Sequence, residues 1–460
     1  MTGDAPQKGE DLTLAFAQDM VKIGRAPLAA RDQEQVRRLL LDLLGVSLCG
    51  SQLPWTTALA TWAKPFDGSG RAAVVGTKLK VSPFIAALVN GTAGHGYELD
   101  DTHDASMSHP GAVVIPAALA VAAEQGSDQA TLLQAIAAGY ETMARVGMAA
   151  NASALIAHGH HPTVMFGAFG AATATGLLLG LDAPKIALAW GHALSLTGGS
   201  MQFSDEPAGT MVKRLHAGYG AQHGVLAAQM AAAGVSAPTR ALDGKYGFLK
   251  LYGRDPRPQL LQRQAGEALQ IHNISMKPYS CCRLFHSLID AIEEATDGYK
   301  VPIGGAKRVM VRGPGVVFDQ HMMRRPTSVM AAQYSLPYVV GATLAYGPTR
   351  YDSYGEAFHQ DPRILALADV VEGEADAEIE KHYPAHFGTS VEITLADGSK
   401  RFAQVMDSRG TPARPMSNAD ISAKAAGLAT AVVPGFDAKA AERAIWGSAD
   451  ASALGALFAA

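Results

Sequence analysis

The stretch DQEQVRRLLLDLLGVSL, residues 32–48, sets the pattern that most of the chain follows. Its apolar side chains recur at intervals of three and four residues, which is typical of an α-helix with one buried face; they are Val36, Leu39, Leu40, Leu43, Leu44 and Leu48. Several of the later helical segments are apolar on nearly all sides, so we expect them to lie inside a helical assembly. The later helical segments as a whole are 112–124, 129–149, 162–181, 184–197 and 220–233.

Near residue 270 the sequence changes from helical patterns to a mixture of strand and helix patterns. Residues 308–312 (RVMVR) read as a strand, and TSVEITL (389–395) and KRFAQV (400–405) alternate around a turn, which predicts a β-hairpin. Residues 327–346 and 364–371 read as helices between these strands, and the tail beyond residue 417 is helical again. We therefore expect a mostly α fold with two domains. A helical domain would comprise residues 1–270 and 406–460, and a smaller α+β domain residues 271–405.

Composition limits the classes of protein that the chain can be. Its 460 residues exceed what one core normally supports, and a net charge of −4 argues against a nucleic-acid-binding protein. Three cysteines, two of them adjacent, exclude a disulfide framework and indicate a reducing compartment. The apolar run 164–181 is interrupted by glycines and lacks flanking membrane anchors, which favours a buried helix. We expect a cytoplasmic protein with no membrane or nucleic-acid partner.

The segment NGTAGHGYELDDTHDASMSHPGAVVIP, residues 90–116, concentrates groups that can transfer protons or bind metals. We consider three interpretations: a metal site, an acid–base cluster whose pKa values are shifted by mutual proximity, or a solvated turn that caps a following helix. The groups are His95, Glu98, Asp100, Asp101, Thr102, His103, Asp104 and His109.

Three further segments carry candidate residues. His161 precedes a proline at the start of an apolar helix, where a neutral imidazole is suited to accept a proton, while His158 and His160 are better explained as helix-capping residues. MVKRLHAG (211–218) holds Lys213, which is either a solvated surface charge or directed inward. MKPYSCCRLFH (276–286) holds Lys277 and Arg283 at the expected domain junction, where ligand clefts are common. An ordinary solvated connection is the alternative there.

These segments, in this order, resemble the MmgE/PrpD family, which includes 2-methylcitrate dehydratase, cis-aconitate decarboxylase and iminodisuccinate epimerase. The strings that carry the resemblance are LLLDLLGVSLCGS, HGYELDDTH, HHPTVMFGAFGAA, MVKRLHAG and MKPYSCCRLFH. The resemblance implies a helical domain built from both chain ends, an inserted α+β lid and a homodimer. It also implies an active site in the cleft between domain and lid that works on a small di- or tricarboxylate without metal or other cofactor.

The resemblance also suggests roles for individual residues. Catalytic roles fall on His161, Lys213 and Lys277, and on the acids Asp100 and Asp101. Substrate-binding roles fall on Glu98, Thr102, His109, Arg283 and Tyr338, the last in the string YSLPYVVGA. The family's first aspartate is Glu98 in this chain, so the three acids are not ranked as acid or base.

The chemistry explains why cations and an imidazole belong together. Removing a proton next to a carboxylate builds an enolate-like dianion, which lysine and arginine charges stabilise. The same groups serve dehydration, decarboxylation or epimerisation. We expect a lyase, first a hydro-lyase of the 2-methylcitrate dehydratase kind, with a decarboxylase of a cis-aconitate-like acid or an epimerase of a dicarboxylate such as iminodisuccinate as alternatives. A metal-dependent hydrolase and a non-catalytic helical interaction protein represent other classes.

Overall fold

The computed structural model of the chain describes residues 11–206, 210–298, 300–447 and 450–459. These fall into two compact units. The first comprises Met1–Gly96, Asp100–Ile274 and Asn418–Ala460, and the second comprises Tyr97–Leu99 and Ser275–Ser417. The smaller unit thus differs from the expected range 271–405: residues 271–274 belong to the first unit, while residues 97–99 and 406–417 belong to the second.

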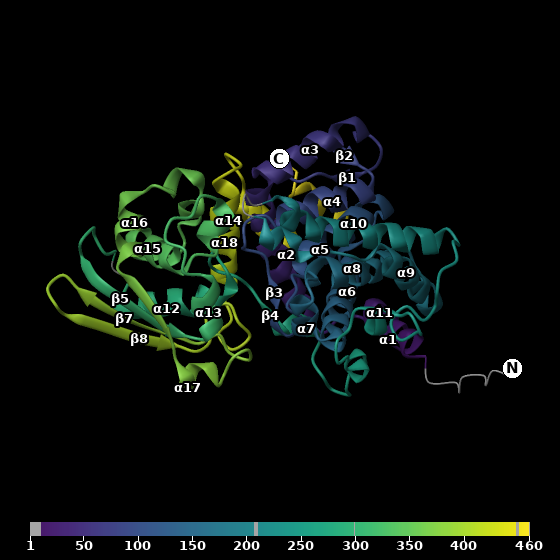
Figure 1. The fold of residues 1–460 in the computed structure, drawn as a ribbon. Helices are drawn as coiled ribbons and strands as arrows, with labels where there is room; N and C mark the ends of the chain where they lie inside the picture. Colours follow the sequence, from purple (N-terminus) through teal and green to yellow (C-terminus); the bar gives the residue numbers. More distant parts are fainter. Residues whose placement is uncertain (1–10, 207–209, 299, 448–449, 460) are drawn as a thin grey trace. The chain divides into compact units, whose positions relative to one another are not determined.

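The first unit is helical and is built from both ends of the chain (Figure 1). The C-terminal helix α18 (Asn418–Thr430) packs on the N-terminal helix α2 (Ala30–Ser51), and two short strands, β1 (Ala72–Ala73) and β2 (Lys80–Val81), pair antiparallel. The other helices are α1 (Leu12–Arg25), α3 (Pro54–Ala63), α4 (Pro83–Gly94), α5 (Gly111–Gln125), α6 (Gln129–Ala150), α7 (Ala152–Ala157), α8 (Pro162–Leu178), α9 (Ala183–Leu196), α10 (Val212–Ala232), α11 (Phe248–Leu251), α19 (Ala438–Trp446) and α20 (Ala451–Ala456).

Helix α8 lies in the core of this unit, where it packs against α6 and α10. It is buried on nearly all sides, as its composition predicts. Helix α10 also packs against α4. A Cβ atom at Gly218 would lie only 2.3 Å from the carbonyl oxygen of Leu88, so the absence of a side chain there allows this approach. The contact fixes the N-terminal turns of α10, which carry Lys213 and His216.

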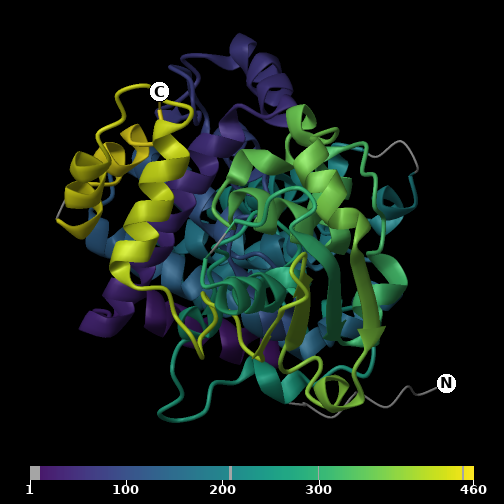
Figure 2. The same ribbon diagram turned by 90° about the vertical axis from the view of Figure 1, so that its left-hand side faces the viewer.

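The second unit combines a four-stranded sheet with helices (Figures 1 and 2). The strand order is β6-β5-β7-β8, with β6 (Val371–Ala375) parallel to β5 (Ala306–Gly313), and β7 (Thr389–Leu395) antiparallel to both β5 and β8 (Lys400–Val405). Helix α12 (His286–Thr296) packs on β7 and β8. The remaining helices are α13 (Gly315–Gln320), α14 (Val329–Gln333), α15 (Leu336–Tyr346), α16 (Pro362–Asp369) and α17 (Ala377–Glu380). The short strand β3 (Thr102–His103) belongs to the first unit, and β4 (Ile274–Ser275) contains the last residue of the first unit before the chain enters the second.

The structure confirms the mostly helical class and the hairpin, and it corrects two details. The segment 364–371 was expected to be a helix throughout, but α16 ends at Asp369 and Val371 begins strand β6. The reason is non-local, because Val371 pairs with Val309 of β5, far away in the sequence. Helix α10 begins at Val212, eight residues before the expected position 220.

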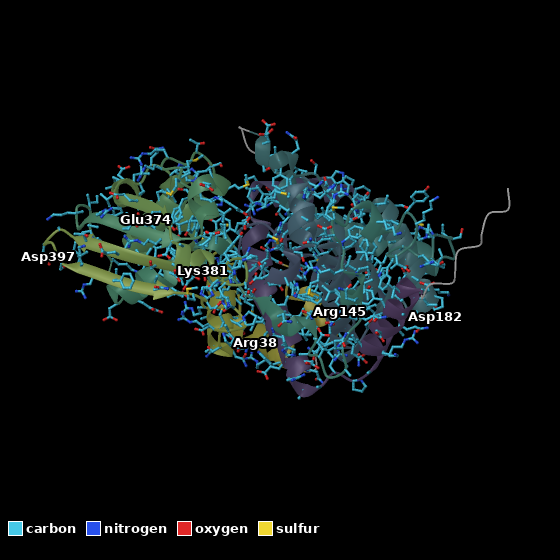
Figure 3. The ribbon with its side chains drawn as sticks, turned by 60° about the horizontal axis from the view of Figure 1, so that its bottom comes forward. Arg38, Arg145, Asp182, Glu374, Lys381 and Asp397 are labelled. Atoms are coloured by element: carbon cyan, nitrogen blue, oxygen red, sulfur yellow. The ribbon has the colours of Figure 1, made fainter. Side chains whose placement is uncertain are left out.

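Two of the charged side chains labelled in Figure 3 stabilise the start of a helix and a turn by accepting hydrogen bonds from the backbone. Asp182 caps α9 by accepting the backbone N–H of Lys185, and Asp397 accepts that of Ser399 in the hairpin turn. Arg145 is buried, unlike most charged side chains. Its guanidinium donates to Glu141 at 2.6 Å. Among the described residues, no helix has the length and apolar character needed to cross a membrane, and the run 164–181 is part of the buried helix α8 and the turn after it.

Candidate active site

The loop between α4 and α5 carries most of the candidate acids and imidazoles. Helix α4 ends at Gly94, and His95 follows directly, with its backbone N–H donating to the carbonyl oxygen of Gly91. The chain belongs to the second unit from Tyr97 to Leu99 and returns to the first unit at Asp100. Helix α5 begins at Gly111, so the loop of residues 95–110 is held at both ends by buried helices.

Asp100 binds two histidines of this loop. Its Oδ2 lies 2.6 Å from Nδ1 of His95 and 3.3 Å from Nδ1 of His109. A carboxylate oxygen only accepts, so Nδ1 of His95 carries the hydrogen. His95 Nε2 is buried, and no described residue hydrogen bonds to it. The three side chains offer donor atoms within 4.8 Å of one another, a spacing at which they could hold a metal ion. The same spacing suits an acid–base cluster.

Asp101 has different partners from Asp100 and stabilises the start of α5. Its Oδ1 accepts the backbone N–H of Gly111 at 2.8 Å, and its Oδ2 accepts the hydroxyl of Tyr140 at 2.7 Å. Burial raises the pKa of Asp101 to about 7, although both hydrogen bonds oppose the shift. A Cβ at position 111 would lie 2.8 Å from the carboxylate oxygens, so glycine is required there. The carbonyl oxygen of Asp101 lies 2.9 Å from Nδ1 of His109 and helps to orient that ring.

His161 occupies the N-cap position of α8 and pairs with a second histidine. Its backbone N–H donates to the carbonyl oxygen of Gly199 at 2.9 Å, and its Nδ1 lies 2.9 Å from Nδ1 of His216 on α10. Burial holds the pKa of His161 well below its ordinary value and lowers that of His216 to about 4. The positive charge of Lys213, one turn before His216, lowers both pKa values further. Both rings are therefore neutral near pH 7.

The structure thus brings four imidazoles into one row within the first unit, three of them buried and that of His109 partly exposed. Ring centroids are 4.9 Å apart between His109 and His95, 6.1 Å between His95 and His161, and 4.9 Å between His161 and His216. Arg214, next to Lys213 in the sequence, is also buried and donates to the carbonyl oxygen of His95 at 3.4 Å. Lys213 and Arg214 are therefore both buried rather than solvated.

Two neighbours in the loop have different environments. The hydroxyl of Thr102 is buried and has no hydrogen-bond partner among the described residues, so it is able to hydrogen bond to a ligand. His103 is fully engaged, because Nδ1 contacts the hydroxyl of Ser106 at 2.8 Å and Nε2 lies 3.1 Å from Oε1 of Gln270. His103 is a structural residue. His158 is exposed and is the C-cap residue of α7, with Nδ1 3.2 Å from the carbonyl oxygen of Ala154; the N-cap position of α8 is occupied by His161 instead.

The second unit holds a buried ion pair. Nζ of Lys277 lies 3.5 Å from Oε2 of Glu98, and both side chains are almost fully buried. Glu98 has a left-handed backbone, with φ of 56°, which is unfavourable for a residue with a side chain. The segment around it is anchored at Tyr97, whose carbonyl oxygen accepts from the hydroxyl of Ser280 at 2.8 Å and from the amide of Gln333 at 3.0 Å.

Two other expected substrate-binding residues have structural contacts within this unit. The guanidinium of Arg283 lies 4.9 Å from the centre of the Phe387 ring and donates to the hydroxyl of Ser408 at 3.1 Å. Tyr338 is fully buried, and its hydroxyl lies within 3.0 Å of the carbonyl oxygens of Ser353 and Phe358. The hydroxyl of Tyr338 is therefore directed into the core of its own unit. Burial also raises the pKa of the Cys281 thiol, which suits an inert filler.

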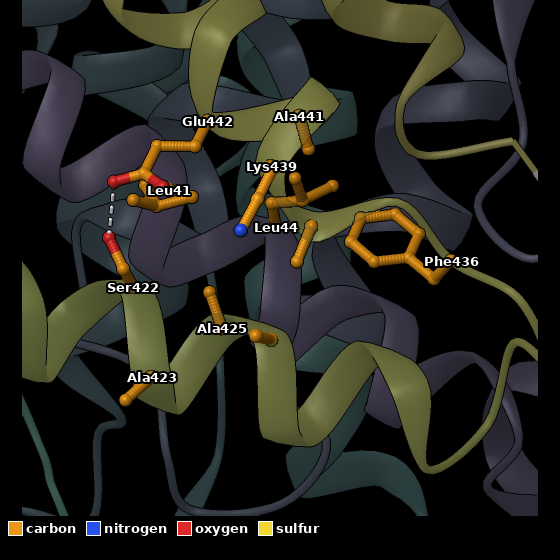
Figure 4. A pocket seen from close by; sticks show the side chains of 11 residues that line it. Leu41, Leu44, Ser422, Ala423, Ala425, Phe436, Lys439, Ala441 and Glu442 are labelled. Carbon is orange, nitrogen blue, oxygen red and sulfur yellow. Dashed lines mark hydrogen bonds between the residues drawn. The ribbon is translucent and has the colours of Figure 1, made fainter.

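A separate pocket of about 280 Å³ lies in the first unit between α2, α18 and α19 (Figure 4). Its walls are mainly apolar, with Leu41, Leu44 and Phe436 among the lining residues. At its edge the hydroxyl of Ser422 donates to Glu442 at 2.7 Å. None of its lining residues is a candidate catalytic residue, so the row of imidazoles remains the candidate site.

A row of imidazoles beside a carboxylate and a lysine is typical of an enzyme that transfers protons, on a mostly helical scaffold. The chain matches the MmgE/PrpD N-terminal domain over residues 15–261 and the MmgE/PrpD C-terminal domain over residues 279–448. It belongs to the MmgE/PrpD family.

Several relatives match over most of their length. A cis-aconitate decarboxylase-like protein of Aspergillus oryzae is 28% identical over 92% of both chains. The cis-aconitate decarboxylase of Aspergillus terreus is 29% identical over 87% of this chain and 85% of its own, and that of Homo sapiens is 26% identical over 90% and 87%.

Proposed function

We propose that the chain is a lyase that decarboxylates cis-aconitate or a closely similar unsaturated tricarboxylate. The observation that carries the proposal is the row of imidazoles from His109 to His216 beside Lys213, in a chain similar to proteins named cis-aconitate decarboxylase. The sequence alone placed a hydro-lyase first. The names of the relatives favour decarboxylation, which was the alternative.

Decarboxylation of such an acid needs a proton donor. When the C–C bond to one carboxylate breaks, CO₂ leaves and the electron pair stays on carbon, delocalised over the adjacent double bond and the remaining carboxylates. A proton must then be added to a carbon of this system. We assign that donation to Nε2 of His161. The ring is neutral when the site is empty, and the negative charges of the substrate favour its protonation when the acid binds.

The other residues of the first unit have supporting roles in this scheme. The charge of Lys213 stabilises the carbanion, and the buried hydroxyl of Thr102 binds a carboxylate. Asp100 holds His95 and His109 in place. Asp101 is a positioning residue for α5 and His109, rather than an acid or base that touches substrate. The family resemblance assigns Lys277, with Glu98, to the same reaction, and we retain Arg283 as a binder of a substrate carboxylate.

The scheme uses no metal or other cofactor. If the cluster of His95, Asp100 and His109 instead holds a catalytic metal, the chain is a metal-dependent enzyme of a different class. Elemental analysis of the purified protein, together with turnover measured in excess chelator, separates the two possibilities. We also propose a cytoplasmic homodimer, which light scattering and cell fractionation can check.

A substrate panel followed by proton NMR tests the function. Purified protein is incubated separately with cis-aconitate, 2-methylcitrate and an aminodicarboxylate, and released CO₂ is measured in parallel. We expect one CO₂ per cis-aconitate consumed and no reaction of the other acids. Dehydration of 2-methylcitrate without release of CO₂ from cis-aconitate would restore the hydro-lyase interpretation.

A further inference from the structure

His216 is a residue for which the scheme above gives no role, and its contact with His161 limits where protons can sit. The two Nδ1 atoms are 2.9 Å apart, which is hydrogen-bond distance. Each neutral imidazole has one nitrogen that donates and one that accepts. One Nδ1 must therefore carry a hydrogen and the other must accept it.

The surroundings bury this pair and hold it in place. His161 is 8% exposed and His216 is 4% exposed. The ring of Phe203 stands edge-on to both imidazoles, with its centroid 5.5 Å from each. The backbone of His161 is anchored to Gly199, and His216 lies in the second turn of α10. Neither ring can turn away without breaking this packing.

We propose that His216 is a positioning residue that accepts the Nδ1 hydrogen of His161 and so confines the exchangeable proton to Nε2 of His161. The catalytic meaning of this inference rests on the proposed function. The hydrogen bond between the two Nδ1 atoms can form with either histidine as the donor. Only with His161 as the donor is the bond kept when His161 changes charge. When His161 gains a proton, both of its nitrogens become donors. A hydrogen bond donated by His216 would then be lost, whereas one accepted by His216 persists in both states.

The arrangement has a structural consequence for catalysis. With Nδ1 of His161 always occupied, every proton gained or lost by the ring passes through Nε2. His216 in turn carries its own hydrogen on Nε2, and burial and the nearby charge of Lys213 disfavour its protonation. His216 thus stays a neutral acceptor while His161 changes charge.

Nitrogen-15 NMR of histidine-labelled protein without substrate tests the inference directly. Spectra that correlate ring nitrogens with ring protons distinguish the two neutral tautomers, and a His161→Gln sample assigns the His161 signals. We expect His161 to carry its hydrogen on Nδ1 and His216 on Nε2 at pH 7. A His161 ring with its hydrogen on Nε2 would overturn the inference.

Three variants of α10 complete the test. In His216→Phe the acceptor is lost, so we expect His161 to change to the Nε2–H tautomer and kcat to fall about tenfold or more with little change in KM. In His216→Asn the side-chain oxygen occupies the place of Nδ1, so the tautomer and most of the rate should return. His223→Phe, on the same helix, is the control, because His223 stacks on Tyr219 and does not contact His161. It should leave the His161 signals unchanged.

The outcomes separate this inference from the proposed function. If wild-type protein releases no CO₂ from any acid in the panel but shows the expected tautomers, the function is wrong and the assignment of His216 as acceptor stands. If wild-type protein decarboxylates cis-aconitate and the His161 signals are identical in His216→Phe, the role of His216 is wrong and the function stands.

Discussion

The hydroxyl of Tyr140 on α6 donates to Oδ2 of Asp101 at 2.7 Å, and this bond holds the loop between α4 and α5 against helix α6. Both oxygens of Asp101 are used in this way, one by Tyr140 and the other by the backbone of Gly111. Asp101 and its neighbour Asp100, although adjacent in the sequence, therefore have different tasks: the carboxylate of Asp101 supports the fold, while that of Asp100 contacts the imidazoles of His95 and His109.

The raised pKa of Asp101 predicts how its contribution to stability depends on pH. Burial raises this pKa from an ordinary 3.8 to about 7, so the folded state binds the proton more tightly than the unfolded state. The resulting stabilisation is fully present below about pH 4 and is lost as pH rises towards 7. In Asp101→Asn, which resembles the protonated form, stability relative to wild type should therefore increase between pH 5 and pH 8. Urea unfolding at several pH values measures this difference, and a constant difference would contradict the prediction.

Removal of the Tyr140 hydroxyl should destabilise the fold. In Tyr140→Phe the buried Oδ2 of Asp101 loses its donor, which typically costs about 1–3 kcal/mol. We expect a lower free energy of unfolding, together with a smaller loss of kcat than in Asp100→Asn, because Tyr140 acts only through Asp101. The comparison of the two variants by urea unfolding and steady-state kinetics checks both parts. Equal stability of Tyr140→Phe and wild type would show that the bond is not formed.

Lys213 should act through its charge. Lys213→Met keeps much of the side-chain volume and removes the cation, so we expect kcat/KM for cis-aconitate to fall by about 100-fold or more with little loss of stability. Loss of the charge should also raise the pKa of His216, because the cation lowers it in the wild-type protein. A titration of His216 by NMR reads this change independently of turnover. An unchanged pKa of His216 would show that the charge of Lys213 does not act on this ring.

Chelation gives a prediction about the cluster of His95, Asp100 and His109. The proposed mechanism requires no metal, so turnover should persist in excess chelator and should not increase when Zn²⁺, Mn²⁺ or Fe²⁺ is added. Loss of activity with chelator that one of these ions restores would assign the cluster to metal chemistry.

The parts of the fold that follow from local patterns could be predicted from the sequence. The repeated apolar spacing located α2, α5, α6 and α9, and the alternation around Asp397 located the β7–β8 hairpin. Strand β6 could not be found in this way, because Val371 becomes a strand residue through its pairing with Val309, which is distant in the sequence. Its own composition does not distinguish it from the end of the preceding helix.

The site was only partly predictable for the same reason. The density of acids and histidines identified the loop, but nothing in the sequence distinguishes Asp100 from Asp101, because their roles depend on Tyr140 and Gly111. The sequence alone gives His216 no role, and the helix expected at residues 220–233 does not include it. With the helix starting at Val212, the spacing of three residues between Lys213 and His216 would have placed both on one face.

In the proposed reaction, His161 delivers a proton to the carbanion that loss of CO₂ forms. Cis-aconitate turned over in deuterated water by wild-type protein and by His161→Gln tests it most directly. The account predicts one deuteron on a carbon of the product for each CO₂ released by wild-type protein, and a rate at least 100-fold lower in a folded His161→Gln. CO₂ release at the wild-type rate in His161→Gln, with deuterium still entering the product, would contradict it.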